Sequence, residues 1–125
     1  IASGCEMLGA IYKIVPDVQD YGQAIRFFTQ ACSKGASTGC LNIGEMYYQG
    51  VGIRRNYNKA VQFYTKACNG GLSVGCFSIG NMYYNGLGIK QDKKKALKFY
   101  VQACNGGYTF ACQVLENKKN IDNTL

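Results

Sequence analysis

Apolar and small residues recur along the chain with helical spacing, in two segments separated by a glycine-rich stretch. In GCLNIGEMYYQG and in NKAVQFYTKACNG they fall at positions i, i+3, i+4 and i+7, which places them on one face of a helix. The positions are Cys40, Ile43, Gly44 and Tyr47 in the first segment, and Ala60, Phe63, Tyr64 and Ala67 in the second. We therefore expect a first helix at about 38–49 and a second helix at about 57–69.

This pattern repeats with a period of 36 residues, as the spacing of Cys40, Cys76 and Cys112 shows. The first repeat is one residue shorter, because Cys5 lies 35 residues before Cys40. We expect a repeat array over residues 1–119, made of repeats at about 2–36, 37–72 and 73–108 and a capping helix at 109–119, followed by a C-terminal tail at 120–125.

Each predicted helix has its own start or stop signal. Asn56 and Asp92 stand one residue before the second helix of their repeats and favour N-caps, and Asp20 holds the same place in the first repeat. Paired glycines in GVGI and GLGI favour a left-handed stop for the first helix. The first repeat has Pro16 and lacks the glycine pair, so its loop is expected to turn by another conformation.

Small residues line the packed face of every predicted helix, which lets neighbouring backbones approach closely while aromatic side chains fill the space beside them. These residues are Gly44, Gly80, Ala60, Ala67, Ala96 and Ala103. A single helical hairpin could not bury such a face, whereas stacked hairpins can. The sequence predicts an all-α fold, an α-solenoid of antiparallel helix pairs.

The segments LNIGEMYYQGVGIRRNYNKAVQFYTKAC and FSIGNMYYNGLGIKQDKKKALKFYVQAC resemble the Sel-one-like repeat, a relative of the tetratricopeptide repeat. The Cys-x7-Cys pairs are similar to those of the Helicobacter cysteine-rich protein (Hcp) family. The resemblance covers residues 2 to about 117, and Glu116 departs from it by replacing a packing glycine, as expected for a terminal cap. It implies a concave groove lined by the first helix of each repeat. Members of the cysteine-rich family have also been described as penicillin-binding proteins and slow β-lactamases.

The cysteines favour disulfides over a metal site. The chain has seven cysteines, no histidine and no CxxC motif, so zinc ligation is not expected and no metal-binding residue is predicted. Disulfides imply an oxidising compartment, and we expect a secreted or periplasmic protein. The chain also lacks an initiator Met, a leader and a long apolar run, so it is expected to be a processed or cut segment without a membrane span.

The repeat also predicts which cysteines pair. The second cysteine of each Cys-x7-Cys unit follows a hairpin bend that brings antiparallel helix ends together, within the separation of about 4.4–6.8 Å that a disulfide requires between Cα atoms. The expected pairs are Cys32–Cys40, Cys68–Cys76 and Cys104–Cys112. Cys5 remains unpaired, either because its partner precedes Ile1 or because it is a free thiol or an intermolecular bridge.

No catalytic, cofactor-binding or cofactor-dependent site is predicted. Histidine-assisted nucleophiles are excluded by the composition, and the S-x-x-K, S-D-N and K-T-G motifs of serine β-lactamases are absent. The carboxylates of Glu6, Glu45 and Glu116 fall in different repeats, while Asp20 and Asp92 are expected caps. Weak β-lactamase activity, with a β-lactam as ligand, therefore remains an alternative that rests on the resemblance alone.

Binding of a protein or peptide in the groove, with host interaction as one setting, is the function that the sequence favours. Polar residues on the first helices form a row that could hydrogen-bond an extended backbone, and two tyrosines could offer flat contact surfaces. The candidate groove residues are Asn42, Glu45, Tyr48, Gln49, Ser78, Asn81, Tyr84 and Asn85. The alternative is an ordinary solvated polar face.

The net charge of +7 adds a second candidate surface. A cluster of lysines marks the start of the last complete repeat's second helix and comprises Lys90, Lys93, Lys94, Lys95 and Lys98. Such a cluster can attract an anionic surface, or it can be a solvated convex face. We expect no nucleic-acid partner, because the aromatic residues keep helical core spacing and do not interleave with Lys and Arg.

Overall fold

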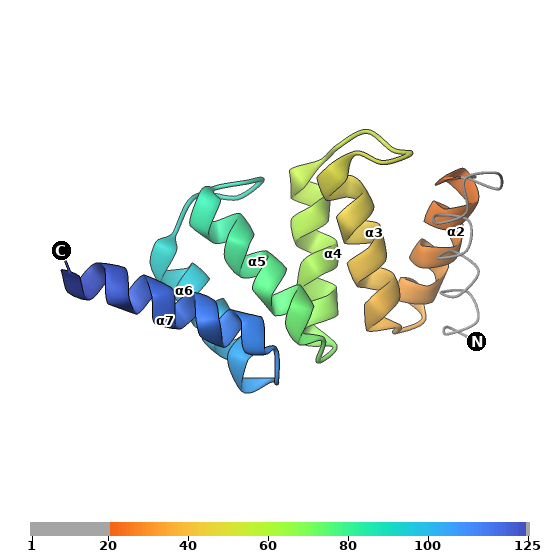
Figure 1. The fold of residues 1–125 in the computed structure, drawn as a ribbon. Helices are drawn as coiled ribbons and strands as arrows, with labels where there is room; N and C mark the ends of the chain where they lie inside the picture. The colour runs from red at the N-terminus through yellow and green to blue at the C-terminus, as the bar shows by residue number, and fades with distance from the viewer. Residues whose placement is uncertain (1–20, 125) are drawn as a thin grey trace.

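The structure is a computed structural model that describes residues 21–124, with side chains up to Lys118. Over this range the chain forms six helices and no strand, so the predicted all-α fold is confirmed. The helices are α2 (Tyr21–Ser33), α3 (Ser37–Gln49), α4 (Tyr57–Asn69), α5 (Ser73–Asn85), α6 (Lys93–Asn105) and α7 (Thr109–Thr124). Figure 1 shows them following one another along an extended array, as an α-solenoid requires.

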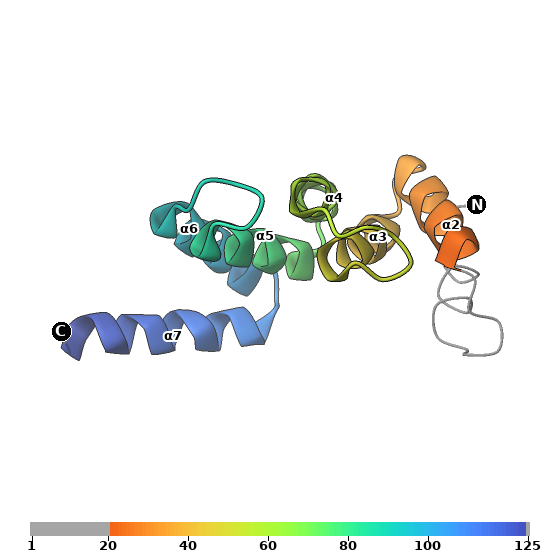
Figure 2. The same cartoon turned by 90° about the horizontal axis from the view of Figure 1, so that it is seen from above.

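The helices alternate between two layers. We call α3, α5 and α7 the A helices and α2, α4 and α6 the B helices, because they are the first and second helices of their repeats. Seen from above in Figure 2, α3 and α7 lie on the opposite side of the array from α4. Each helix contacts its neighbours in the sequence, which confirms the stacking of antiparallel hairpins.

The observed bounds agree with the sequence pattern except at the C-terminal end. The first and second helices expected at about 38–49 and 57–69 are Ser37–Gln49 and Tyr57–Asn69. The capping helix was expected to end at residue 119, whereas α7 continues to Thr124 through most of the segment expected to be a tail.

The predicted caps form at α4 and α6. The Asn56 Oδ1 atom accepts a hydrogen bond from the backbone N–H of Lys59, and the Asp92 Oδ1 atom accepts one from Lys95, both at 3.0 Å. These bonds satisfy backbone donors that the first helical turn leaves unpaired. The prediction for the first repeat, with Asp20 and Pro16, lies outside the described residues.

Glycines allow the helices to approach within each repeat. A Cβ atom on Gly44 would lie 2.9 Å from the Tyr64 ring, and one on Gly80 would lie 2.7 Å from the Tyr100 ring. The helix pairs α3–α4 and α5–α6 therefore pack with a tyrosine ring directly against a bare backbone. The core follows the array as a series of small clusters between successive helices, such as the cluster of Ala24, Phe28, Ile43 and Met46.

The glycine-rich loops connect each repeat to the one before it. Gly50 and Gly86 end α3 and α5 in the left-handed conformation, at φ 72° and 67°, as the glycine pairs predicted. The second glycine of each pair lies against the preceding B helix, where a Cβ atom on Gly88 would lie 2.5 Å from the Tyr57 carbonyl carbon. The loop thus contributes to stacking as well as to chain reversal.

The three predicted disulfides are present, and each closes the bend between a B helix and the next A helix. The Cα atoms lie 4.6 Å apart in Cys32–Cys40, 4.5 Å apart in Cys68–Cys76 and 4.8 Å apart in Cys104–Cys112. These separations fall inside the range that a disulfide needs, about 4.4–6.8 Å. The unpaired thiol predicted at Cys5 lies outside the described residues.

Candidate functional site

A small polar cavity opens between the A helices α3 and α5. It has a volume of about 150 Å³ and is lined by Glu45, Tyr48, Tyr64, Ser78, Asn81 and Met82. Glu45 and Tyr48 come from α3, while Ser78 and Asn81 come from α5, so the stacking of two repeats creates the cavity. The fold therefore brings together half of the side chains that the sequence predicted for a groove.

The other predicted groove residues lie beside this cavity and do not line it. Asn42 is half-buried on α3, whereas Gln49 is exposed. Asn85 is exposed, and its Nδ2 atom donates a hydrogen bond to the Asn81 carbonyl oxygen at 3.0 Å. The Asn85 side chain is thus hydrogen-bonded within its own helix, α5.

Tyr84 is partly covered by other side chains. The ammonium nitrogen of Lys118 on α7 lies 3.6 Å from the centre of the Tyr84 ring, within cation–π distance. The ammonium nitrogen of Lys93 lies 5.2 Å from the same centre. Tyr84 therefore does not present the open flat surface that the sequence suggested, whereas Tyr48 does line the cavity.

Two cavity residues bind hydroxyl groups of the core. The Tyr100 hydroxyl donates a hydrogen bond of 2.6 Å to the Asn81 Oδ1 atom, and the Tyr64 hydroxyl is hydrogen-bonded to Glu45. Tyr64 and Tyr100 are almost fully buried, at 2% and 1% exposure. Asn81 and Glu45 are thus half-buried and hydrogen-bonded to core tyrosines. The expectation that both face solvent without contacts to the core is wrong.

These environments keep both tyrosines protonated. Burial raises the pKa of Tyr64 far above its usual value, and the charge of Glu45 and its hydrogen bond raise it further. Burial, assisted by Tyr84, raises the pKa of Tyr100 to about 12. Both hydroxyls therefore act as donors at neutral pH, and the Glu45 carboxylate and the Asn81 Oδ1 atom act as acceptors.

The residues that line the cavity retain further hydrogen-bonding capacity. The Asn81 Oδ1 atom is occupied by the Tyr100 hydroxyl, but the side-chain amide of Asn81 also carries two N–H donors. Ser78 and Tyr48 add hydroxyl groups, and the Glu45 carboxylate has acceptor sites beyond the one that Tyr64 uses. Donors and acceptors placed side by side in this way match the alternating N–H and C=O groups of a peptide backbone.

Within the described residues, no group of three or more His, Cys, Asp or Glu side chains could hold a metal ion. Among the described residues, Glu45 is the only carboxylate that lines the cavity, so they place no pair of carboxylates there for general acid and base chemistry. The described cavity has the composition of a binding site.

Sequence reasoning did not identify the two buried tyrosines as part of this site. Tyr64 and Tyr100 belong to the packed stripe of the B helices, and helical spacing assigns them to the core. The available signal was the period itself, because Glu45 and Asn81 are 36 residues apart, as are Tyr64 and Tyr100. Each polar residue therefore stands 19 residues before a core tyrosine in both repeats, which is consistent with a hydrogen bond that repeats with the period.

Helical hairpins of 36 residues, closed by disulfides and stacked in two layers, define an α-solenoid repeat protein. The chain belongs to the Sel1 repeat family, whose model matches residues 17–35, 37–72 and 73–108. The second and third matched segments have the bounds expected for those repeats, and the first covers residues 17–35 of the repeat expected at about 2–36.

Among proteins of known sequence, the chain is similar to HcpC of Helicobacter pylori, described as "Putative beta-lactamase HcpC". In one strain (J99) the two are 45% identical over 38 residues, and in a second strain (26695) they are 43% identical over 37 residues. Each match covers 30% of this chain and 13% of the relative. The matched segment is therefore a small part of the relative's length.

Solved structures extend the likeness to most of the chain. A protective antigen of uropathogenic Escherichia coli, c5321, which displays an SLR fold, superposes with a TM-score of 0.85 at 29% identity, over 92% of this chain and 25% of that chain. A Sel1 repeat protein of Oxalobacter formigenes superposes with a TM-score of 0.85 at 26% identity, over 92% of this chain and 47% of that chain. Cysteine-rich protein B (HcpB) of Helicobacter pylori superposes with a TM-score of 0.79 at 27% identity, over 91% of this chain and 88% of that chain.

The match to HcpB confirms the similarity to the Helicobacter cysteine-rich proteins. Together with the three disulfides it indicates an extracytoplasmic protein. None of the helices described here combines the length and the apolar character that crossing a bilayer would need.

Proposed function

We propose that the protein is a secreted or periplasmic interaction module that binds an extended segment of a partner protein in a groove along its A helices. The observation that carries this proposal is the polar cavity between α3 and α5, where residues of two repeats meet. Sel1 repeats are helical modules suited to protein interaction, because stacking builds a continuous surface from repeated elements.

The cavity supplies the two things that backbone recognition needs. Ser78, Asn81 and Glu45 offer donors and acceptors within one small volume, and Tyr48 offers an aromatic surface beside them. The bonds to Tyr64 and Tyr100 hold Glu45 and Asn81 in place before a partner arrives. Binding to side chains that are already ordered loses less conformational entropy, which favours affinity.

A cavity-filling substitution tests the proposal. Ser78→Arg places a long side chain in the cavity, and Asn69→Arg adds the same charge at an exposed position at the end of α4. Partner proteins are captured from host extracts and from bacterial envelope fractions with immobilised wild-type protein and with each variant. Circular dichroism and thermal melting establish that both variants are folded.

We expect a partner that the wild type and Asn69→Arg capture and that Ser78→Arg releases. A partner held equally by all three proteins would place the contact surface elsewhere and would contradict the proposal. A peptide array of the captured partner then identifies the extended segment, whose binding must show the same dependence on Ser78.

β-Lactam binding with weak hydrolysis is the second candidate function. Its support is the similarity to HcpC of Helicobacter pylori, which is described as a "putative beta-lactamase" and matches a short stretch of this chain. Incubation of the purified protein with a chromogenic cephalosporin tests it directly. Hydrolysis that Ser78→Arg abolishes would support a site in the cavity, whereas hydrolysis unaffected by the substitution would indicate a contaminating enzyme.

A further inference from the structure

Two adjoining cavities lie on the third repeat, away from the cavity between the A helices. The first has a volume of about 300 Å³ and is lined by Tyr83, Lys95, Lys98, Phe99 and Gln102. The second has a volume of about 250 Å³ and is lined by Tyr83, Ile89, Lys90, Gln91, Asp92 and Lys95. Because Tyr83 and Lys95 line both, the two cavities form one continuous depression, which we call the lysine pocket.

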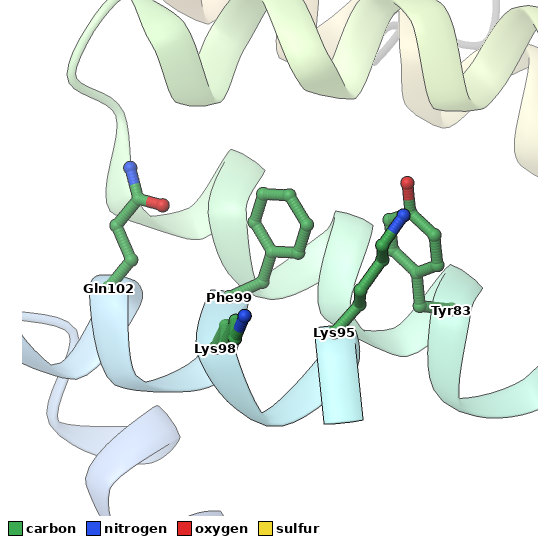
Figure 3. A pocket seen from close by; sticks show the side chains of 5 residues that line it. All are labelled: Tyr83, Lys95, Lys98, Phe99 and Gln102. Carbon is green, nitrogen blue, oxygen red and sulfur yellow. The ribbon is translucent and has the colours of Figure 1, made fainter. Parts of the chain in front are cut away.

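The floor of the lysine pocket is aromatic. The Tyr83 and Phe99 rings are stacked, with centroids 5.5 Å apart and planes inclined by 10°. Figure 3 shows Lys95, Phe99 and Gln102 projecting from α6 toward the same side, with Tyr83 of α5 beside them. Both rings are half-buried, so part of their apolar surface is available to a ligand.

The rim of the pocket is positively charged. Lys90, Lys95 and Lys98 are all exposed, and the ammonium nitrogen of Lys95 lies 5.6 Å from the centre of the Tyr83 ring. Within the part of the chain that the structure describes, Asp92 is the only acidic residue that lines either cavity, and its Oδ1 atom already accepts the N-cap hydrogen bond from the backbone N–H of Lys95. The lining therefore carries an excess of positive charge.

The wall of the pocket is held in place by hydrogen bonds. The backbone N–H of Asp92 donates to the Tyr83 carbonyl oxygen at 2.9 Å, and the Gln91 Nε2 atom donates to the Tyr84 carbonyl oxygen at 2.9 Å. The loop that leads from α5 into α6 is thereby fixed to the end of α5. A pocket with a fixed wall loses little conformational entropy when a ligand binds.

Comparison with the second repeat shows which parts of the lysine pocket recur along the array. The stacked pair recurs there as Tyr47 and Phe63, with centroids 5.8 Å apart, so the aromatic floor is part of the repeat's architecture. The basic rim recurs in a different arrangement, because Lys90 and Lys95 correspond to Arg54 and Lys59 one period earlier, while Gln91 and Gln102 correspond to Arg55 and Lys66. Lys98, which corresponds to Gln62, is the rim lysine that the second repeat lacks.

We propose that the lysine pocket binds an acidic peptide segment of a protein partner, with an apolar side chain on the Tyr83–Phe99 floor and neighbouring carboxylates on the lysine rim. The volume of the pocket suits one bulky side chain, and the arrangement of floor and rim matches an apolar residue flanked by acidic residues. A purely electrostatic attraction to an anionic membrane or to nucleic acid would use the lysines but not the apolar floor. The site is independent of the proposed groove, since no residue lines both.

Labelled peptides and matched variants test this site in the full chain. The probe is a short fluorescent peptide in which single phenylalanines are separated by glutamates, and its controls replace phenylalanine by serine or glutamate by glutamine. The test variant is Lys95→Gln with Lys98→Gln. The control variant, Lys34→Gln with Lys66→Gln, removes the same charge at exposed lysines outside the pocket.

Fluorescence anisotropy should show that the test variant binds the probe roughly tenfold more weakly, while the control variant changes affinity by less than about twofold, as for charges near a surface. Affinity should fall as salt rises, and both control peptides should bind more weakly than the probe. Equal losses in the two variants would show non-specific charge attraction and overturn the proposal. If the peptide with serine in place of phenylalanine bound as tightly as the probe, the Tyr83–Phe99 floor would not contribute to binding, which would also overturn the proposal.

Two further probes distinguish other classes of partner. Vesicles containing phosphatidylglycerol and a single-stranded oligonucleotide are offered in competition with the labelled peptide. We expect neither to displace it at concentrations where unlabelled peptide does. Displacement by vesicles or by the oligonucleotide in preference to the peptide would contradict the assignment to an acidic protein segment.

Discussion

The Tyr100 hydroxyl donates a hydrogen bond of 2.6 Å to the Asn81 Oδ1 atom, joining the buried face of α6 to the cavity-lining face of α5. Tyr64 and Glu45 make the equivalent contact one repeat earlier. A buried hydroxyl without a partner would raise the free energy of the folded state, so these polar side chains contribute to stability as well as to the candidate site. The candidate site and the core of the solenoid are therefore energetically linked.

Asn81→Ala is expected to destabilise the protein by about 1–3 kcal/mol, because it leaves the Tyr100 hydroxyl buried without an acceptor. Urea unfolding followed by circular dichroism measures the change. Asn42→Ala is the matched control on the neighbouring A helix, since no hydrogen bond joins the Asn42 side chain to the other residues of the described range 21–124. Its cost should stay under about 0.5 kcal/mol, as for ordinary surface substitutions.

The double variant Asn81→Ala with Tyr100→Phe identifies the cause. Removing both partners leaves no unsatisfied group, so the double variant should lose less stability than the two single variants together. Strict additivity would show that the two side chains act independently and would contradict the structural link.

Stability should fall in alkaline solution because of the buried tyrosines. The pKa of Tyr100 is raised to about 12 in the fold, above its value of 10.0 in the unfolded chain, so the folded state holds its proton more tightly. The resulting stabilisation is fully present below pH about 10 and decreases as pH rises from about 10 toward about 12. Urea midpoints measured between pH about 8 and 11, on protein with alkylated free thiols, should show this decline.

Tyr100→Phe is the control for the alkaline decline. The variant lacks the titrating hydroxyl, so its urea midpoint should depend less steeply on pH than that of the wild type. Tyr64→Phe should act in the same direction, because burial and Glu45 raise the pKa of Tyr64 as well. Identical slopes in the wild type and both variants would assign the decline to other groups.

The helices and their ends were predictable because their signals are local. Asn56 caps α4 through a bond to a residue three positions away, and Gly50 ends α3 by its own backbone conformation. The disulfides were predictable for a similar reason, since eight residues separate Cys68 from Cys76 and a bend must return the chain. A period that repeats such local signals also fixes the solenoid.

The polar face of the A helices was less predictable, because its details depend on contacts between helices. Helical spacing places Asn81 toward solvent, but its bond to Tyr100 crosses 19 residues and turns the side chain partly inward. Lys118 covers Tyr84 from a different helix. The direction of a half-buried side chain is set by partners that sequence spacing alone does not identify.

In the glycine-rich loops too, the local conformation was predictable and the contacts between repeats were not. A glycine pair predicts the left-handed end of an A helix, and Gly86 meets that expectation. The contact of Gly88 with Tyr57 of the preceding repeat was not predictable from the pair, because it depends on how the hairpins stack. Sequence indicates where the chain turns, and packing decides what the turn touches.

Gly44→Leu is expected to destabilise the protein by about 1–3 kcal/mol or more, through overpacking between α3 and α4. The reason is the Tyr64 ring, which would lie 2.9 Å from a Cβ atom at this position and cannot move away inside the core. Urea unfolding measures the loss. Gln49→Leu, at an exposed position of the same helix, should be nearly neutral and controls for added apolar surface.

A second substitution shows whether the ring causes the effect. Tyr64→Ala opens space beside position 44 at its own cost in stability. In that background Gly44→Leu should cost less than in the wild type, because the two substitutions share one contact. If Gly44→Leu destabilises the Tyr64→Ala variant as much as the wild type, the leucine side chain clashes with a residue other than Tyr64.

Mass spectrometry of the intact chain should identify three disulfides and one alkylated thiol at Cys5. Peptide mapping under non-reducing conditions should link Cys68 to Cys76, as the structure does. A link between Cys68 and Cys104 would be incompatible with the hairpin bends. Reduction should lower stability and leave helical circular dichroism largely intact, because the helices also pack along the whole array.

Removing single bridges should distinguish loop closure from packing. The Cys68–Cys76 and Cys104–Cys112 bridges close loops of equal length, so the chain-entropy estimate is the same for both, about 2.5 kcal/mol. Cys68 and Cys76 are also buried, at 4% and 3% exposure, whereas Cys104 and Cys112 are half-buried. Replacing the first pair by alanines should therefore destabilise the protein more than replacing the second, in urea unfolding of otherwise oxidised protein. Equal losses would show that loop closure alone determines the contribution of these bridges.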